Sequence, residues 1–280
     1  MMKNVRTRKK VRAVFIYLEL ILMAIIVIYP VMWIVGSSFG SSLGLANASA
    51  IPENPTLQNY RDLFANTSFP RWYLNTIYVA VANMFFGVLL STLSAYAFSR
   101  FSFKGKKASL LTILILQMFP TFLTAIAVYM LFLNFGLLDR LTGLIVVGVA
   151  AQLPYNMWLL KGYIDEIPMS FDEAALIDGA TRTQIFVQII LPLTRPMLTF
   201  VAVTQFAAPW MDFILPRLLI SSEEKKTVAI GLFTMIDDQT RNEFTLFAAG
   251  AVLVAVPTIL LFVFLQKYLI SGLTAGGEKG

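Results

Sequence analysis

Six long apolar stretches divide the sequence, and they constrain its fold more than any other feature. Each is about 20 residues or longer, the length that a helix needs to cross the ~30 Å hydrocarbon layer of a bilayer. A helix satisfies its own backbone hydrogen bonds there, which an irregular segment does not. The predicted spans are residues 13–35, 72–98, 108–133, 141–160, 197–220 and 246–267. We therefore expect an all-α membrane protein with six transmembrane helices.

The composition supports a membrane protein and excludes most kinds of enzymatic site. Of the 280 residues, 58% are hydrophobic and 14% charged, more apolar surface than a soluble domain of this length can bury. The chain has no cysteine and no histidine, so disulfides, thiolate or imidazole metal sites and Ser-His-Asp triads are excluded. We expect no catalytic residue, no metal site and no enzymatic activity in this chain.

The basic residues predict how the spans are oriented. Six lysines and arginines precede residue 13, and the net charge is +6. Basic residues gather on the cytoplasmic side of membrane proteins. With a cytoplasmic N-terminus, 15 of the 22 fall inside, and those outside are Arg61, Arg71, Arg140, Arg217, Lys225, Lys226 and Arg241. We therefore expect both termini in the cytoplasm, and the charge indicates topology rather than a nucleic-acid partner.

The chain is expected to form one transmembrane domain, 1–280, with two notable soluble segments. Residues 161–196 form a large cytoplasmic region, and residues 221–244 an extracytoplasmic loop. The loop has mixed charge at both ends and a less polar middle, which suits contact with a soluble partner. The candidate contact residues are Ile230, Gly231, Leu232, Phe233 and Thr234. A solvated linker is the alternative, although 24 residues exceed the usual connection between helices.

Within the cytoplasmic region, the residue pattern predicts a helix, a sharp turn and a second helix. Ser170 and Glu173 have the spacing of a capping box, and Gly179 fits a left-handed C-terminal position. Thr181 is placed to cap the next helix. The small Ala174 and Ala175, the charge of Glu173 and nearby apolar residues suit docking against another protein.

The same segment carries a family resemblance. Glu173, Ala174 and Ala175 are followed by Gly179 and then by Ile189, Leu191 and Pro192. This spacing matches the EAA signature of binding-protein-dependent ABC importer permeases. Together with six spans and the C-terminal QKYLISGLTAGGEKG, the chain resembles the MalG-type permeases of maltodextrin and related oligosaccharide importers over nearly its whole length.

The resemblance implies a fold, a set of partners and site residues. The fold is that of a type I ABC importer permease in the bacterial inner membrane, forming half of a carbohydrate pathway. The partners are a second homologous permease, two cytoplasmic ATPase subunits and an extracytoplasmic sugar-binding protein. Residues 170–179 would form the coupling helix, so the expected ATPase-coupling residues are Ser170, Glu173, Ala174, Ala175, Gly179, Ile189, Leu191 and Pro192.

Two alternatives remain beside this interpretation. The chain lacks a Gly-x4-Gly-Lys-Ser/Thr phosphate cradle, so energy comes from a separate subunit or from an ion gradient. Under the resemblance, ATP and magnesium are bound by the partner ATPase, and this chain needs no cofactor. An autonomous ion-coupled carrier is disfavoured because only Glu19 and Asp212 are acidic within the spans. The second alternative is that the cytoplasmic helices only lie on the membrane surface, but anionic lipid would repel their acidic residues.

Uncharged amides within the spans are the candidates for the substrate pathway. Asn83, Gln117, Asn156 and Gln205 suit a hydroxyl-rich substrate. Amides also form hydrogen bonds between neighbouring transmembrane helices, which is the competing interpretation for each of them.

Overall fold

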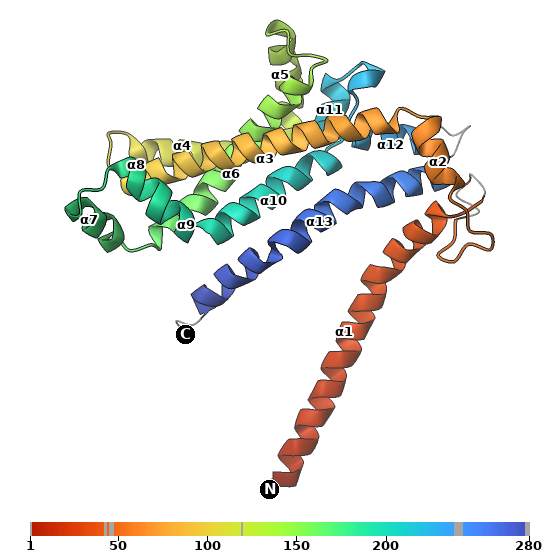
Figure 1. The fold of residues 1–280 in the computed structure, drawn as a ribbon, viewed down its shortest axis with the longest axis horizontal. Helices are drawn as coiled ribbons and strands as arrows, with labels where there is room; N and C mark the ends of the chain where they lie inside the picture. Colours follow the sequence, from red (N-terminus) through yellow and green to blue (C-terminus); the bar gives the residue numbers. More distant parts are fainter. Residues whose placement is uncertain (1, 42–43, 45–47, 119, 238–242, 278–280) are drawn as a thin grey trace. The chain divides into compact units, whose positions relative to one another are not determined.

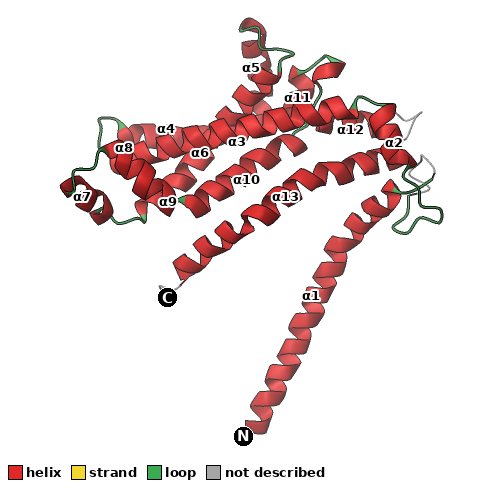
Figure 2. Ribbon diagram, viewed as in Figure 1, coloured by secondary structure: helices red, strands yellow, loops and turns green. Residues whose placement is uncertain are grey.

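The computed structural model describes residues 2–41, 44, 48–118, 120–237 and 243–277, and it is helical, with no strand within these residues (Figures 1 and 2). Arg241, counted above among the outside cations, lies outside the described residues. The α-helices are α1 (Met2–Ser38), α2 (Gln58–Ala65), α3 (Phe69–Arg100), α4 (Lys106–Gln117), α5 (Thr121–Asn134), α6 (Leu141–Asp165), α7 (Ser170–Ile177), α8 (Arg182–Ile185), α9 (Leu191–Leu193), α10 (Arg195–Met211), α11 (Ile214–Leu219), α12 (Val228–Asp237) and α13 (Phe244–Gly277). A π-helical turn, η2 (Phe186–Ile190), and a 3-10 turn, η3 (Glu223–Lys225), complete the order.

Four helices among the described residues are long and apolar enough to cross a membrane: Arg12–Ser38, Phe69–Arg100, Leu141–Asp165 and Phe244–Gln266. They correspond to the first, second, fourth and sixth predicted spans. A fifth arises if the segments Arg182–Leu193 and Arg195–Met211, bent by 77°, are counted together. The all-α membrane class is therefore confirmed, whereas the prediction of six spans is matched only in part.

The third predicted span is not one helix. Residues 108–133 divide into α4, which ends at Gln117, and α5, which begins at Thr121. Pro120 has an extended backbone (ψ 125°) and no N–H, so it begins a new helix rather than continuing the first. The continuous apolar pattern concealed this break.

The fifth predicted span is also interrupted. Residues 197–220 comprise most of α10, a break at Asp212 with ψ 113°, and α11. Pro216 lies four residues after Asp212, where its ring would clash with the Asp212 carbonyl in a continuous helix. The helix therefore ends one residue before Asp212.

The chain forms two compact units. The first consists of Met1–Thr67 and Leu232–Leu253, and the second consists of Ser68–Gly231 and Val254–Gly280. In the first unit, Asn59 organises the segment after α1. Its Nδ2 donates to the carbonyls of Ser38 (2.9 Å) and Gly40 (2.8 Å), and its Oδ1 accepts from Thr245 Oγ1 (3.3 Å). Because Asn59 is buried, these bonds also satisfy its amide group.

In the second unit, α3, α6 and α10 pack against one another. Glycines allow the close approach. A Cβ on Gly87 of α3 would lie 2.4 Å from Nε2 of Gln205 in α10, and a Cβ on Gly148 of α6 would lie 2.4 Å from Nδ2 of Asn83 in α3. Small residues commonly admit neighbouring helices in membrane proteins. Here each glycine makes room for a buried amide side chain.

Candidate functional site

The turn after α7 has the geometry that the sequence predicted. Gly179 has φ 84°, in the left-handed region, and it follows the C-terminal residue Asp178. Gly179 N–H donates to Leu176 O (3.1 Å), and Ala180 N–H donates to Ala175 O (2.9 Å). These two bonds form a Schellman motif, which satisfies the last carbonyls of the helix and reverses the chain.

The helix starts on either side of this turn differ from each other. Thr181 caps α8 through a complete capping box: Gln184 N–H donates to Thr181 Oγ1 (3.3 Å), and Thr181 N–H donates to Gln184 Oε1 (2.7 Å). The cap predicted for Ser170 is wrong, because Met169 occupies that position and no side chain caps α7. Pro168 places its carbonyl within reach of Phe171 N–H (3.2 Å), so a backbone turn begins the helix instead.

Helix α7 has an exposed face and a buried face. Asp172 and Ala175, three residues apart, are buried. Its exposed residues are Ser170, Phe171, Glu173, Ala174, Leu176 and Ile177, and Asp178 and Gly179, which follow the helix, are exposed as well. Ile177 exposes 86% of its surface, and Phe171 on the same helix exposes 49%. Ala174 and Glu173 are thus available to a partner protein, whereas Ala175 contributes by packing inside this subunit.

The buried face of α7 is held by an ion pair that sequence reasoning missed. Arg100, the last residue of α3, places Nε 3.1 Å from Oδ2 of Asp172, and their side chains are 2% and 1% exposed. Arg100 Nη2 also donates to Ile167 O (2.9 Å) in the segment before α7. Removing one member of such a pair would leave an uncompensated buried charge. No short motif joins positions 100 and 172, so the sequence offered no signal.

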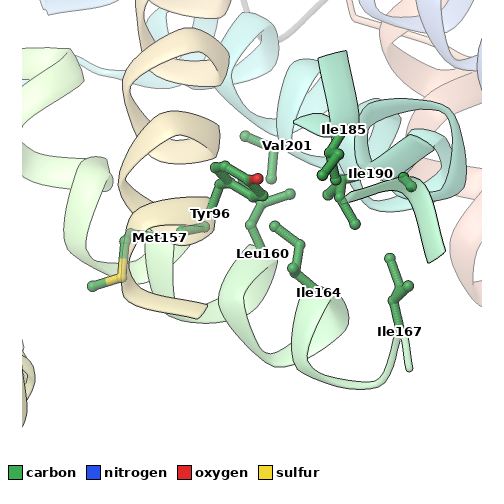
Figure 3. Packing of buried hydrophobic residues seen from close by; sticks show 10 residues of the cluster. Tyr96, Met157, Leu160, Ile164, Ile167, Ile185, Ile190 and Val201 are labelled. Atoms are coloured by element: carbon green, nitrogen blue, oxygen red, sulfur yellow. The ribbon is translucent and has the colours of Figure 1, made fainter. Parts of the chain in front are cut away.

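Ile167, whose carbonyl Arg100 binds, belongs to a hydrophobic cluster that Figure 3 shows. This cluster joins Tyr96 of α3, Leu160 and Ile164 of α6, and Val201 of α10 to residues of the segment between α6 and α10. That segment contributes Ala175, Ile185 and Ile190, with Ile189 packed against the cluster. The two helices after Pro168 are therefore anchored to three long helices of the unit.

The end of the motif forms a bend. Residues Phe186–Ile190 make a π-helical turn, and Leu191 N–H donates to Phe186 O. Pro192 supplies no N–H and is partly buried, as is Leu191. The axis then turns by 77° into α10, with Thr194 Oγ1 donating to Ile190 O (2.6 Å) at the corner. Ile189, Leu191 and Pro192 thus shape the connection to α10 rather than an exposed surface.

The four candidate pathway amides do not lie together. Asn83, Asn156 and Gln205 are at most 2% exposed and lie within the packing of α3, α6 and α10. Asn83 borders a cavity of about 50 Å³ with Gln152, Asp212 and Thr227, polar enough to hold ordered water. Gln117, by contrast, is exposed and lines an open hollow. The first three pack between helices, but both amide atoms of Asn156 and of Gln205 lack a hydrogen-bond partner among the described residues, so the interhelical interpretation is matched in packing and not in hydrogen bonding.

The segment 221–244 is folded onto the second unit at its start. Asn75 Nδ2 donates to the carbonyls of Glu224 (2.8 Å) and Lys226 (2.9 Å), and Val228 N–H donates to Thr76 Oγ1 (2.8 Å). A solvated linker would not be held this way.

The predicted contact residues of this segment lie in α12. Ile230 is fully buried, Leu232 is 6% exposed, and a Cβ on Gly231 would lie 2.0 Å from the Trp72 ring. Phe233 is 38% exposed and Thr234 is partly exposed. Only the last two present side-chain surface to a partner.

Asp139 connects this segment to the loop between α5 and α6. Its N–H donates to Leu219 O (2.8 Å), and its carboxylate accepts from Ser221 N–H (3.0 Å), Ser222 N–H (2.9 Å), Ser222 Oγ (2.5 Å) and Lys225 Nζ (2.8 Å). Partial burial alone would raise the pKa of Asp139, but the hydrogen bonds from Lys225, Ser222 and Ser221 outweigh it and hold that pKa well below its ordinary value.

These features define an all-helical membrane protein whose helix-turn-helix segment is anchored to its long helices. The chain belongs to the family of binding-protein-dependent transport system inner membrane components, which it matches over residues 87–274. It is 42% identical over 283 residues to the galactooligosaccharides transport system permease protein GanQ of Bacillus subtilis (strain 168), covering 100% of both chains. It is 40% identical to the maltodextrin transport system permease protein MdxG of the same organism, covering 99% of this chain and 100% of the relative.

Solved structures share the fold. A bacterial ABC transporter involved in the import of the acidic polysaccharide alginate superposes with a TM-score of 0.80 at 24% identity, covering 92% of this chain and 96% of the other. The same class of transporter, in complex with a periplasmic protein bound to alginate pentasaccharide, gives a TM-score of 0.71. The resemblance stated from the EAA signature is therefore confirmed, as is the location in the inner membrane. Members of this family are transport subunits, and none of these relatives is an ion-coupled carrier.

Proposed function

We propose that this chain is the permease subunit of a binding-protein-dependent ABC importer for carbohydrates, of the maltodextrin or related oligosaccharide kind. It forms half of the pathway beside a second homologous permease. Two cytoplasmic ATPase subunits bind ATP and magnesium, and an extracytoplasmic protein delivers the sugar. The names of the relatives support the substrate class.

One observation carries the coupling role: α7 exposes apolar residues on one face while its other face is tied to the long helices. Phe171 and Ile177 are 49% and 86% exposed, whereas Asp172 and Ala175 are buried. Exposed apolar residues beside the Glu173 carboxylate suit a socket on an ATPase. Closure of the ATPases would move α7, and the Arg100–Asp172 pair and the hydrophobic cluster would carry that movement to α3, α6 and α10.

The proposed topology places six spans in the bilayer with both termini in the cytoplasm. In it α4 and α5 together form the third span, and α10 with α11 forms the fifth. Residues 161–196 are then the cytoplasmic coupling region of a single permease domain, and residues 221–244 face the binding protein. The basic residues support this orientation.

The test is reconstitution of this chain with its three kinds of partner in proteoliposomes. We expect uptake of radiolabelled maltotriose or β-1,4-galactobiose that requires ATP and the loaded binding protein. Uptake that continues without the ATPase subunits and collapses with a protonophore would instead establish an ion-coupled carrier. Reporter fusions after residues 37, 104, 137, 179 and 237 would check the orientation of each connection.

A further inference from the structure

An open hollow of about 540 Å³ lies among α4, α5 and α6, with Leu215 of α11 at its margin. We call it the α4–α6 hollow. Its volume falls within the range of about 300 to 1,000 Å³ that is typical of small-molecule sites. The described residues that line it are Leu116, Gln117, Thr124, Val128, Val147, Ala150, Ala151, Pro154, Tyr155 and Leu215.

The α6 side of the hollow is one face of that helix. Val147, Ala150, Ala151, Pro154 and Tyr155 follow the spacing of a single helical face. Ala150 and Ala151 are exposed, and Tyr155 exposes 55% of its surface. The alanines leave room above the helix, so the ring of Tyr155 offers a flat aromatic surface beside an open space.

Polar groups reach the hollow from two interrupted helices. Gln117 is the exposed last residue of α4, directly before the break that precedes α5. In α6, Pro154 has no N–H, so the carbonyl of Ala150 lacks its regular helical donor. Interrupted helices in transporters commonly expose backbone groups to a substrate site. The amide, the phenol and this carbonyl supply both donors and acceptors.

The lining also indicates which ligands fit. None of the described residues bordering the hollow is Asp, Glu, Lys or Arg. A charged solute would find no counter-ion there, whereas a neutral, hydroxyl-rich ring finds hydrogen-bonding groups and an aromatic face.

We propose that the α4–α6 hollow is a subsite for a neutral carbohydrate, so that this subunit itself contacts the sugar during translocation. A sugar ring stacks on Tyr155 while its hydroxyls exchange hydrogen bonds with the Gln117 amide. This inference rests on the proposed function as a carbohydrate importer. It places the pathway on the exposed face of α6, opposite the buried Asn156.

The first test uses uptake of radiolabelled maltotriose by the full complex, with ATP hydrolysis measured in parallel. Losing one stacking partner or one hydrogen bond costs about three- to tenfold in affinity. We expect Tyr155→Ala and Gln117→Leu each to lower maltotriose carried per ATP by about three- to tenfold. Stimulation of ATP hydrolysis by the loaded binding protein should remain. Tyr155→Phe keeps the ring and should retain most transport.

Tyr78→Ala is the matched control, because Tyr78 is a 53% exposed tyrosine of α3 that does not border the hollow. Its transport should equal that of the unmodified complex. Unchanged transport per ATP in both Tyr155→Ala and Gln117→Leu would overturn the subsite. So would an equal loss in Tyr155→Ala and Tyr78→Ala.

The second test reads occupancy directly and uses the absence of cysteine from this chain. In a complex whose other subunits carry no reactive thiol, Ala151→Cys places one thiol in the hollow. We expect a small hydrophilic thiol reagent to label this thiol. If sugar occupies the hollow for about two-thirds of the time during maltotriose turnover, labelling should slow about threefold. Tyr78→Cys should label at the same rate with and without sugar.

Labelling of Ala151→Cys that is slow without sugar and unchanged by it would mean that a helix of the partner permease fills the hollow, and the proposal would fall. If the unmodified complex transports no oligosaccharide at all, the proposed function fails and takes the carbohydrate subsite with it. The two failures are distinguishable, since the first leaves uptake by the unmodified complex intact.

Discussion

Arg100 Nε lies 3.1 Å from Asp172 Oδ2, and this pair joins the end of α3 to the buried face of α7. Both side chains are almost completely removed from solvent. The same arginine also binds the Ile167 carbonyl, so it holds both the helix and the segment that leads into it. A force applied to the exposed face of α7 therefore reaches α3 through a contact that solvent does not weaken.

Breaking this pair should uncouple the importer. Asp172→Ala leaves the Arg100 guanidinium buried without its counter-ion, a change that costs about 3 to 5 kcal/mol for buried pairs. We expect a lower melting temperature of the purified complex and loss of sugar uptake. Replacing both residues, as in Arg100→Met with Asp172→Leu, should recover much of the thermal stability but not the coupling. If the Asp172→Ala complex melts and transports like the unmodified one, the Arg100–Asp172 pair does not couple α7 to α3.

Gly179 should be sensitive to side-chain branching, and its backbone is the reason. No atom lies within 4 Å of a Cβ built there, so crowding plays no part, but φ is 84°. A non-glycine residue in such a conformation costs about 1 to 3 kcal/mol, and most for a β-branched one. We expect Gly179→Val to insert normally and to transport poorly, with Gly179→Asn intermediate. Gly162→Ala, which is equally uncrowded but helical, should be neutral; normal transport by Gly179→Val would contradict the turn.

Glu173 is predicted to form a charge-assisted contact with the ATPase. It lies on the exposed face of α7, beside Ala174 and Phe171. Reversing its charge should weaken binding of the ATPase by about tenfold or more, which copurification and ATPase titration would measure. Glu166→Lys is the control, because Glu166 is exposed but precedes α7. Equal ATPase retention by Glu173→Lys and Glu166→Lys would show that position 173 has no special role.

Sequence reasoning located the helices well where apolar length decides the outcome. Four spans depend on hydropathy, and the turn at Gly179 depends on the special conformation of glycine. Both properties are local, so a short stretch of sequence reveals them. Thr181 and Gln184 formed the capping box for the same reason. The family could also be recognised, because the spacing from Glu173 to Pro192 is long and specific.

Features that depend on distant contacts were not predictable. The Arg100–Asp172 pair joins residues far apart in the chain, and the burial of Ala175 follows from packing on α3 and α6. The continuous run of apolar residues also concealed the break at Pro120, because apolar residues dominate on both sides of it. Among the amides, only the three-dimensional packing separates Gln117 from the buried Asn83.

Asp139 should confer a pH dependence on stability. Its folded-state pKa is depressed, so its contribution is present above the unfolded pKa of about 3.9 and is lost as pH falls toward the folded value. Asp139→Asn removes the charge while tolerating the positive φ of 55°. We expect the variant to melt below the parent at pH 7 and the difference to shrink below about pH 4. A difference that stays constant with pH would mean that the carboxylate charge does not matter.

Two nearby residues of α12 should differ in their roles: Gly231 in packing and Phe233 in docking of the binding protein. Gly231 lies against the buried Trp72 ring, which leaves no room for a methyl group, whereas Phe233 is 38% exposed. Gly231→Ala should therefore lower the melting temperature, because overpacking of this kind costs about 1 to 3 kcal/mol. Phe233→Ala should lower that temperature less than Gly231→Ala does and should reduce the stimulation of ATP hydrolysis by the loaded binding protein, because a partly exposed aromatic side chain is typical of interface anchors. The two measurements are melting of the purified complex and ATP hydrolysis titrated with loaded binding protein, with Asp237→Asn, exposed at the end of the same helix, as the control. If Phe233→Ala is stimulated as strongly as Asp237→Asn and the unmodified complex, α12 serves only to pack the loop, and the binding protein must dock on other residues.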